Sequence, residues 1–365
     1  LYVDKTAILQ KLVEEGQWYF LSRPRRFGKS LTLSTLDAMF SGKADLFKGL
    51  KAEEWVTEQA KHPSAVLRFD MSISASNLES SLMEMIFRAA RKHKVTLHSE
   101  TLGGVFVELI EGIFESYGSV VILIDEYDKP ILDNISDLAK ANEMREVLRS
   151  FYTVLKSCDE YLRFVMLTGI SKFSKVGVFS TLNNLHDISM LSAYGDIVGY
   201  TQQELEENFS EWLASSSSAM SMMQNELLEK IRDYYDGFSF DGKYRLYNPF
   251  SILNFFWDKK FGNYWYTSGS PTFIVKYMKE HKIQNPEEYR HREVPQDFSD
   301  SQEIESSTPE SFLYQSGYLT IEKWENDVIT LDYPNEEVKK SLVRMYLNEI
   351  YRVKRFITLG NEIWK

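Results

Sequence analysis

The sequence predicts an α/β protein whose first 200 residues form a parallel sheet flanked by helices. Short apolar runs alternate with segments of helical apolar spacing, the pattern of parallel α/β architecture. The expected strands are 18–22, 65–72, 120–126, 163–170 and 187–191. The expected helices lie around 30–40, 76–95, 101–117 and 138–157. A Gly-Lys-Ser tripeptide between the first strand and the first of these helices supports the same fold class.

That tripeptide, Gly28-Lys29-Ser30, is the second half of a phosphate-binding P-loop. In a strand–loop–helix context Lys29 is expected to reach the β- and γ-phosphates of a nucleotide, and Ser30 to hold Mg²⁺. Backbone N–H groups of the loop and of the helix N-terminus are expected to face the phosphates. The residues expected to bind the nucleotide are Arg26, Phe27, Gly28, Lys29, Ser30 and Leu31.

The loop differs from the usual pattern because Arg23 stands where the first glycine is expected, and Pro24 stiffens the chain after it. Arginines 23, 25 and 26 could neutralise phosphate charge, or they could be solvated or paired with acidic neighbours. The two readings are balanced for Arg26, and the second is favoured for Arg25. A positive φ at Arg23 would contradict the alignment.

A buried aliphatic strand, 120–124, ends in Asp125-Glu126. The carboxyl ends of strands in open α/β sheets bind ligands, so Asp125 is expected to support Mg²⁺. Glu126 is expected to polarise a water molecule for attack on the γ-phosphate. The alternative is that the two acidic residues only cap the turn before Pro130.

A second apolar strand, 163–167, ends in Thr168-Gly169. A polar residue at this place in P-loop ATPases with an additional strand lies between the two motif strands and senses the γ-phosphate. Thr168 is the first candidate for that catalytic role and Ser171 the second. The alternative for Thr168 is an ordinary strand that ends in a Thr-Gly turn.

The composition is that of an ordinary globular protein of 365 residues, large enough for two or three domains. A net charge of −11 disfavours a general nucleic-acid-binding surface. The single Cys158 excludes an intrachain disulfide and a zinc site made of cysteines, which favours a reducing, cytoplasmic setting. The apolar runs are too short to span a bilayer. Because the chain starts at Leu1, we expect it to belong to a longer gene product.

The second half of the chain reads as mostly helical. Helices are expected at 202–213, at 221–235 and from 249 onward, and the serines 215–218 read as a linker between two of them. The polar region 284–309 is expected to include an exposed loop. The predicted domains are 1–200 for the P-loop unit, 201–280 for a helical lid or winged-helix-like domain, and 281–365 for a helical or linker region.

With these motifs assembled, the chain resembles the AAA-ATPase-like family of bacterial proteins, which often carry a C-terminal PD-(D/E)XK nuclease domain. The resemblance rests on several motifs, and it makes Arg23 a family trait. The matching segments are Tyr2-Val3-Asp4-Lys5-Thr6, 23–30, Asp125-Glu126-Tyr127-Asp128-Lys129-Pro130, Thr168-Gly169-Ile170 and 179–185, and, in the second half of the chain, 235–238, 247–251, 264–265 and 315–320.

The resemblance implies ATP or ADP binding, ATP hydrolysis with Mg²⁺, and a five-stranded parallel sheet of order 5-1-4-3-2. A helical lid and a winged-helix-like region would follow, and Tyr2 to Thr6 could contribute to the adenine pocket. From the residues alone, Asp4 or Thr6 could instead cap the helix that follows. Glu337-Val338-Lys339, with Asp332 before it, matches a nuclease core only by its short pattern. We expect no nuclease activity from this fragment, because too little chain follows residue 340 to form a nuclease sheet.

The leading hypothesis is therefore a Mg²⁺-dependent ATPase whose nucleotide state controls an attached effector, most plausibly a nuclease domain. A second hypothesis is a nucleotide-gated switch with negligible hydrolysis, and a third, less favoured, is a P-loop kinase for a small molecule. DNA is a candidate partner through the winged-helix-like region. An oligomer is possible, and no membrane partner is expected.

Overall fold

The computed structural model describes residues 1–72, 77–134, 137–172, 182, 184–267, 275, 277–279, 285–300 and 307–347. The chain divides into two compact units. The first consists of Leu1–Tyr200 and Ser299–Thr308, and the second of Thr201–Phe298 and Pro309–Lys365. The three-domain division expected from the sequence stays a prediction.

The first unit is built on a five-stranded sheet of order β2-β3-β4-β1-β5, in which all paired strands are parallel. The order confirms the prediction of 5-1-4-3-2. The strands are β1 (Trp18–Ser22), β2 (Ala65–Asp70), β3 (Val120–Asp125), β4 (Leu162–Gly169) and β5 (His186–Asp187). The interior strands β1 and β3 are buried along their whole length, as expected for strands covered on both faces. The strand expected at 187–191 is shorter than predicted and starts one residue earlier.

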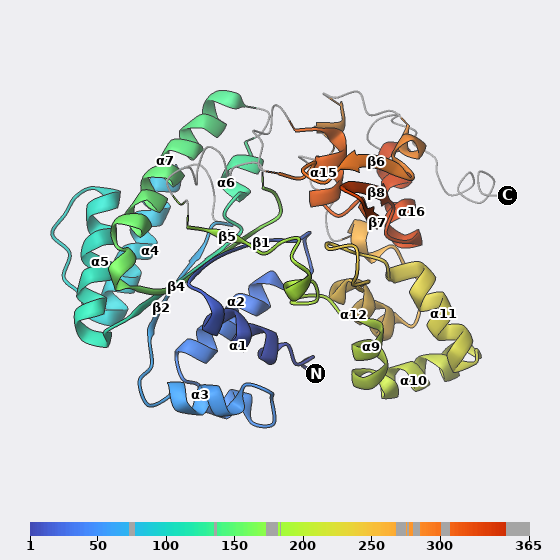
Figure 1. Ribbon diagram of the computed structural model, residues 1–365, viewed down its shortest axis with the longest axis horizontal. Helices are drawn as coiled ribbons and strands as arrows, with labels where there is room; N and C mark the ends of the chain where they lie inside the picture. Colours follow the sequence, from blue (N-terminus) through green and yellow to red (C-terminus); the bar gives the residue numbers. More distant parts are fainter. Residues whose placement is uncertain are drawn as a thin grey trace. The chain divides into compact units, whose positions relative to one another are not determined.

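Helices cover both faces of this sheet. Helices α4, α5 and α7 lie together on one face, and α1, α2 and α3 lie on the other (Figure 1). Their bounds are α1 (Thr6–Glu15), α2 (Lys29–Phe40), α3 (Glu53–Gln59), α4 (Leu78–His93), α5 (Leu102–Tyr117), α6 (Lys129–Leu132) and α7 (Leu138–Ser157). Short 3₁₀ turns add η1 (Ala44–Phe47), η3 (Asp159–Tyr161) and η4 (Ser192–Tyr194). The rings of Phe69, Phe106 and Phe151, 4.5–5.3 Å apart, fill the core between the sheet and α5 and α7.

The segment before α1 has a structural role. Asp4 accepts hydrogen bonds from the backbone N–H of Thr6 at 2.8 Å and of Lys51 at 2.9 Å. The Thr6 hydroxyl accepts another from the N–H of Ala52 at 3.0 Å. These bonds fix the start of α1 and tie it to the turn before α3. A contribution of this segment to an adenine pocket stays a prediction.

The second unit is helical, with one small sheet. Its helices are α9 (Gln202–Asn208), α10 (Ser210–Met220), α11 (Gln224–Tyr235), α12 (Pro249–Asp258), α13 (Tyr264–Thr267), η5 (Pro286–Tyr289), α15 (Pro309–Gln315) and α16 (Glu336–Met345). The antiparallel sheet has the order β6-β8-β7, with β6 (Arg292–Pro295), β7 (Thr320–Glu325) and β8 (Val328–Asp332). This sheet was not predicted, and the winged-helix-like character of the region stays a prediction.

The prediction that serines 215–218 form a linker is wrong. All four lie inside α10, where Ser216 is fully buried and Ser215 accepts a 2.7 Å hydrogen bond from Lys259 Nζ. The expected helix 202–213 instead breaks at Phe209, whose ring stacks on Phe256. Tertiary packing outweighs the weak helix propensity of serine here.

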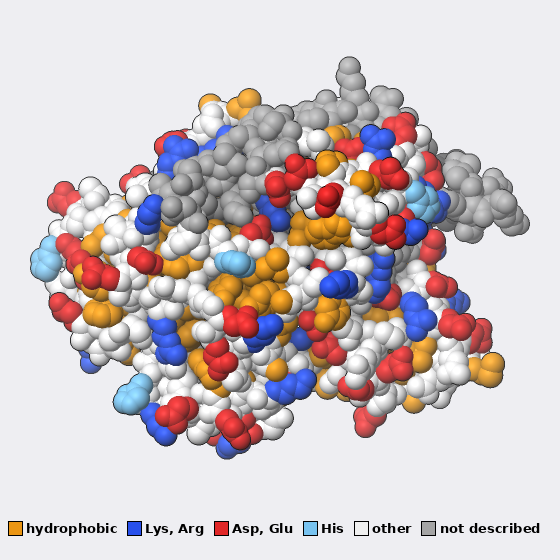
Figure 2. All heavy atoms as spheres, viewed as in Figure 1, with side chains coloured by type: hydrophobic (Ala, Val, Ile, Leu, Met, Phe, Trp, Pro, Cys, Tyr) orange, Lys and Arg blue, Asp and Glu red, His pale blue; other side chains and the backbone are white. Residues whose placement is uncertain are grey.

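None of the helices in the described ranges is both long enough and apolar enough to cross a lipid bilayer. Acidic and basic side chains are mixed over the face shown in Figure 2.

Candidate nucleotide-binding site

The phosphate loop connects the end of β1 at Ser22 to the start of α2 at Lys29. Gly28 precedes the helix with a φ of 98°, in the left-handed region. A Cβ atom at Gly28 would meet no heavy atom within 4 Å, so the backbone angle, and not lack of space, requires glycine there. Arg26 is also left-handed, with a φ of 68°. These two residues turn the chain sharply into the helix.

The predicted nucleotide-binding residues surround the N-terminus of α2. Arg26, Ser30 and Leu31 are exposed, while the Phe27 side chain is buried in the core, so only its backbone can contact a ligand. The first N–H groups of a helix have no partner within the helix and attract anions. The exposed Ser30 hydroxyl is therefore in the first turn of a helix that is suited to phosphate.

Lys29 is held by its own loop. Its Nζ donates hydrogen bonds to the carbonyl oxygens of Arg23 at 2.9 Å and Pro24 at 3.0 Å, and the residue is only 6% exposed. Burial lowers the pKa of Lys29 to about 8, while the nearby carboxylates of Asp125, Asp128 and Glu126 act to raise it. The amine is therefore still mostly protonated at neutral pH.

Arg23 has a role that neither of the two interpretations of the loop arginines anticipated. Arg23 is not among the residues with a positive φ in the described part of the chain, which agrees with aligning it to the first glycine of a P-loop. Its guanidinium is buried and donates to the carbonyl oxygens of Ser22 at 2.9 Å, Ser189 at 2.6 Å and Tyr194 at 3.4 Å. The backbone N–H of Arg23 also donates to the Gly169 carbonyl at 3.1 Å. The side chain is thus neither a solvated loop residue nor a phosphate ligand, and it fixes the loop to the segment after β5.

Asp125 and Glu126 lie where β3 ends. Asp125 is buried, and its Oδ1 accepts from the backbone N–H of Glu126 at 3.0 Å. Glu126 is half-buried and left-handed, with a φ of 50°, and burial raises its pKa although Lys29 and Arg25 oppose the shift. A carboxylate with a raised pKa is a better proton acceptor near neutral pH. The Glu126 carbonyl also accepts from the N–H of Lys129, so the acidic pair opens the turn before Pro130 as well.

Thr168 lies beside Asp125. Strand β4 runs between β1 and β3, with Leu21 opposite Thr168 and Ile124 opposite Leu167. The fully buried Thr168 hydroxyl donates a 2.7 Å hydrogen bond to Asp125 Oδ1. Thr168 is therefore between the strand that leads into the phosphate loop and the strand that ends in the acidic pair.

Asp128 belongs to the site and received no role from the sequence, although it is part of the quoted Asp-Glu-Tyr-Asp motif. It is fully buried, and burial raises its pKa. Its Oδ2 accepts from the backbone N–H of Ile170 at 3.0 Å and from both the N–H and the hydroxyl of Ser171 at 2.7 Å. Ser171, the second sensor candidate, is thus bound to Asp128 and not to Asp125.

Residues 1–179 match the model of a family described as predicted AAA-ATPase. This part of the chain belongs to the AAA-ATPase-like family. All of the site residues above, from Arg23 to Ser171, lie within the matched range. Of the family-like segment 179–185, residues 179–181 and 183 lie outside the described residues.

An uncharacterized protein from the vnfD 5′ region of Azotobacter chroococcum mcd 1 is 37% identical to this chain over 348 residues. The match covers 93% of the chain and 65% of that relative, so the chain spans less than two thirds of the relative's length.

Two solved structures are more distantly similar to the chain. The ORC1 protein of Aeropyrum pernix in complex with DNA has a TM-score of 0.34 and 9% identity, with 96% of this chain and 94% of that chain covered. Cdc6p of Pyrobaculum aerophilum has a TM-score of 0.29 and 12% identity, with 96% and 92% covered. At such values the fold assignment rests on the order and direction of the strands themselves.

Proposed function

We propose that the AAA-ATPase-like unit binds ATP with Mg²⁺ at the phosphate loop and hydrolyses it to ADP and phosphate. The observation that carries this proposal is the common position of Lys29, Asp125 and Thr168 at the carboxyl edge of the sheet. Thr168 touches Asp125, and the carboxylates of Asp125 and Glu126 both act on the Lys29 amine. A cation, a metal-binding carboxylate and a neutral hydroxyl are the groups that phosphoryl transfer needs in one place.

In this mechanism Lys29 exchanges the carbonyls of Arg23 and Pro24 for the β- and γ-phosphate oxygens. The hydroxyl of Ser30 and the carboxylate of Asp125 supply the hard oxygen ligands that suit Mg²⁺, which neutralises phosphate charge when bound. Glu126 accepts a proton from the attacking water as the water oxygen bonds to the γ-phosphorus and the bond to the β-phosphate oxygen breaks. Thr168 holds Asp125 in place and senses the γ-phosphate.

The hydrolysis cycle is proposed to control an effector, a nuclease domain, in a longer protein. The match to a relative of greater length supports a protein with further sequence. DNA contact through the second unit, oligomer formation and a cytoplasmic setting belong to the same proposal. Glu337 and Lys339 lie on helix α16, so the short Glu-x-Lys pattern is not on a strand, and we propose no nuclease activity for these residues.

A nucleotide-gated switch with negligible hydrolysis is the second candidate. The contacts of Lys29 with two loop carbonyls favour it, because ATP must break both bonds before the lysine is free. The Arg23 guanidinium also restrains the loop through its hydrogen bonds to the carbonyl oxygens of Ser22 and Ser189. Within the described ranges, no comparable observation favours a small-molecule kinase.

Phosphate release and ATP affinity, measured together on the purified chain with Mg²⁺, test the proposal. Lys29→Ala should weaken ATP binding by about 10- to 100-fold, the value of one or two hydrogen bonds to a charged group. Glu126→Gln should retain ATP binding and lose about 100-fold or more of the hydrolysis rate. Lys43→Ala, which removes an exposed lysine beyond α2, should change neither quantity.

The outcomes separate the candidates. Tight ATP binding with background phosphate release in the unmutated chain would favour the switch. Full ATP affinity in Lys29→Ala would overturn the site itself.

A further inference from the structure

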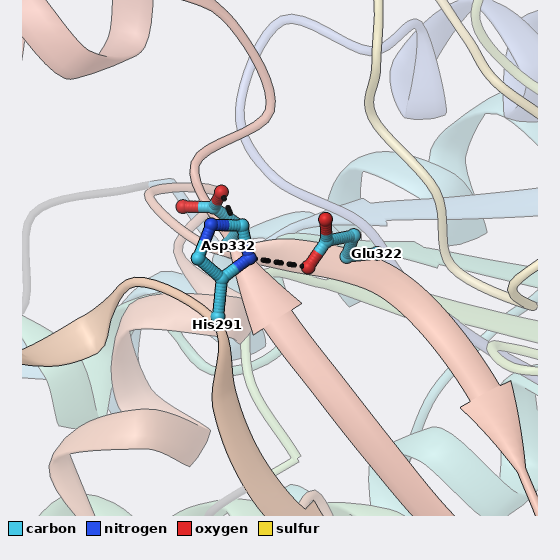
Figure 3. Close-up of side chains that lie close together, drawn as sticks. All are labelled: His291, Glu322 and Asp332. Atoms are coloured by element: carbon cyan, nitrogen blue, oxygen red, sulfur yellow. Dashed lines mark hydrogen bonds and ion pairs between the residues drawn. The ribbon is translucent and has the colours of Figure 1, made fainter.

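A second cluster of ionisable side chains lies in the other unit, far in sequence from the phosphate loop. His291 immediately precedes β6, whereas Glu322 lies in β7 and Asp332 ends β8, and the three side chains point toward one another (Figure 3). His291 Nδ1 lies 2.8 Å from Glu322 Oε2 and 3.6 Å from Asp332 Oδ2. Each residue offers one possible ligand atom, and these three atoms lie within 4.8 Å of one another.

The backbone of the sheet brings these three side chains together. Arg292 pairs with Leu331 in the antiparallel ladder, so the adjacent His291 lies next to Asp332 at the end of β8. The register of β7 against β8 shifts between Ile321 and Lys323, which makes Glu322 the extra residue of a β-bulge. Bulges turn a side chain away from the regular alternation of a strand. Here the bulge places the Glu322 carboxylate on the side of His291.

His291 itself has a φ of 48°, in the left-handed region that a residue with a side chain seldom adopts. This conformation lets the ring turn back over the sheet from a position just before β6. A strained residue at the centre of a cluster of ligand-type side chains is a reason to look for a function.

Neighbouring groups orient the two carboxylates. Asp332 Oδ1 accepts from the backbone N–H of Tyr333 at 2.7 Å and from Arg290 Nε at 3.4 Å, so the other oxygen, Oδ2, is the one near His291. The Arg245 guanidinium donates to the carbonyl oxygens of Ile321 at 2.8 Å and Glu322 at 2.6 Å and holds the backbone at the bulge. Such outer contacts are typical of residues that present ligands to a metal.

We propose that His291, Glu322 and Asp332 bind a divalent first-row metal ion of the Zn²⁺ type, with water in the remaining coordination position. Zn²⁺ accepts imidazole nitrogen and carboxylate oxygen at about 2.0–2.2 Å, which puts tetrahedral ligand atoms about 3.4 Å apart. The two separations from His291, 2.8 and 3.6 Å, lie on either side of this value, and all three ligand atoms lie within 4.8 Å of one another, so small side-chain movements would bring them to a metal ion. His291 is 59% exposed, which leaves the cluster open to water and to an entering ion.

The metal would join the chain before β6 to β7 and β8, the two other strands of the sheet. It would therefore stabilise this sheet by cross-linking three segments. The site is independent of the phosphate loop, and its test needs no nucleotide.

Titration of chelator-treated full chain with Zn²⁺ in a calorimeter, without nucleotide, tests the proposal. The unmutated chain should bind one Zn²⁺ per molecule. His291→Ala and Asp332→Asn should each weaken that binding by at least about tenfold. His62→Ala, which removes an exposed histidine of the first unit, should leave it unchanged.

Co²⁺ provides a direct readout of the ligands, because its visible absorption depends on them. A Co²⁺ band that is present in the unmutated chain and in His62→Ala, and absent in His291→Ala, would support the assignment. The proposal is overturned if no stoichiometric Zn²⁺ binding occurs, since the cluster is then only an ion pair of His291 with two carboxylates. Binding that survives both His291→Ala and Asp332→Asn overturns it equally.

Discussion

The Thr168 hydroxyl donates a 2.7 Å hydrogen bond to Asp125 Oδ1, and both groups are buried where β3 and β4 end side by side. The bond joins the strand that ends in the acidic pair to the strand next to the phosphate loop. It therefore orients the carboxylate that we propose for Mg²⁺. A hydrogen bond to a charged group is worth about 1.5–3 kcal/mol.

Replacement of Thr168 by valine keeps the shape of the side chain and removes this bond. We expect the rate of phosphate release to fall by about 10- to 100-fold, because the Asp125 carboxylate then keeps only its hydrogen bond from the Glu126 N–H and is less well oriented. Thr168→Ser, which keeps the hydroxyl, should retain most of the rate. A phosphate-release assay at saturating ATP makes the comparison, and a fully active valine variant would exclude a role for the bond.

Restoring the usual glycine, with Arg23→Gly, should harm the protein. The change leaves the buried carbonyls of Ser22, Ser189 and Tyr194 without their donor and adds backbone freedom, so we expect a loss of about 3 kcal/mol in the free energy of unfolding. Urea denaturation measures this loss, and Arg91→Ala, at an exposed arginine of α4, should change stability by less than about 0.5 kcal/mol. A variant as stable as the unmutated chain would contradict a structural role for Arg23.

Glu126 should show a conflict between stability and activity. Glycine adopts the left-handed backbone of residue 126 without strain. We therefore expect Glu126→Gly to raise the free energy of unfolding by up to about 1 kcal/mol, measured by urea denaturation, while hydrolysis is lost. Glu126→Gln retains a side chain at the same φ and should lose hydrolysis without this gain. Equal stability of the two variants would show that the conformation carries no cost.

Glu337 should make the stability of the second unit dependent on pH. It is fully buried, one oxygen accepts from the backbone N–H of Trp265 at 2.8 Å, and burial raises its pKa to about 7 from 4.5. Between these two values the folded chain binds more protons than the unfolded chain, so stability is highest below the unfolded pKa and falls as the pH rises to about 7. The total loss from this group is about 3 kcal/mol.

Urea denaturation over this range of pH, for Glu337→Gln against the unmutated chain, isolates that loss. The variant should lack this part of the pH dependence, whereas Glu336→Gln, at an exposed neighbour on α16, should retain it. The same pH dependence in all three proteins would assign it to other groups.

The parts of the fold that could be predicted are those in which local pattern and burial agree. The strands β1, β3 and β4 are mostly apolar because neighbours cover both faces, and that composition is visible without a structure. The sheet order came from the family resemblance, and the observed strand pairs confirm it. The positions of Lys29, Asp125 and Thr168 at one edge follow from these strands.

The rest depends on contacts between residues distant in the sequence. Strands β7 and β8 were missed because their exposed faces carry charged and polar residues, and their only buried apolar side chains are Ile321, Ile329 and Leu331. The serines of α10 are helical because of tertiary contacts, which a local sequence pattern does not reveal. The role of Arg23 requires Ser189 and Tyr194, more than 160 residues later.

The buried arginine has a mechanical consequence. Its guanidinium is bonded at once to the end of β1 and to residues 189 and 194, on the stretch of chain that leaves the first unit at Tyr200. A glycine in its place would let the phosphate loop move alone. With arginine, a displacement of the loop must also move residues 189 and 194 or break their hydrogen bonds to the Arg23 guanidinium.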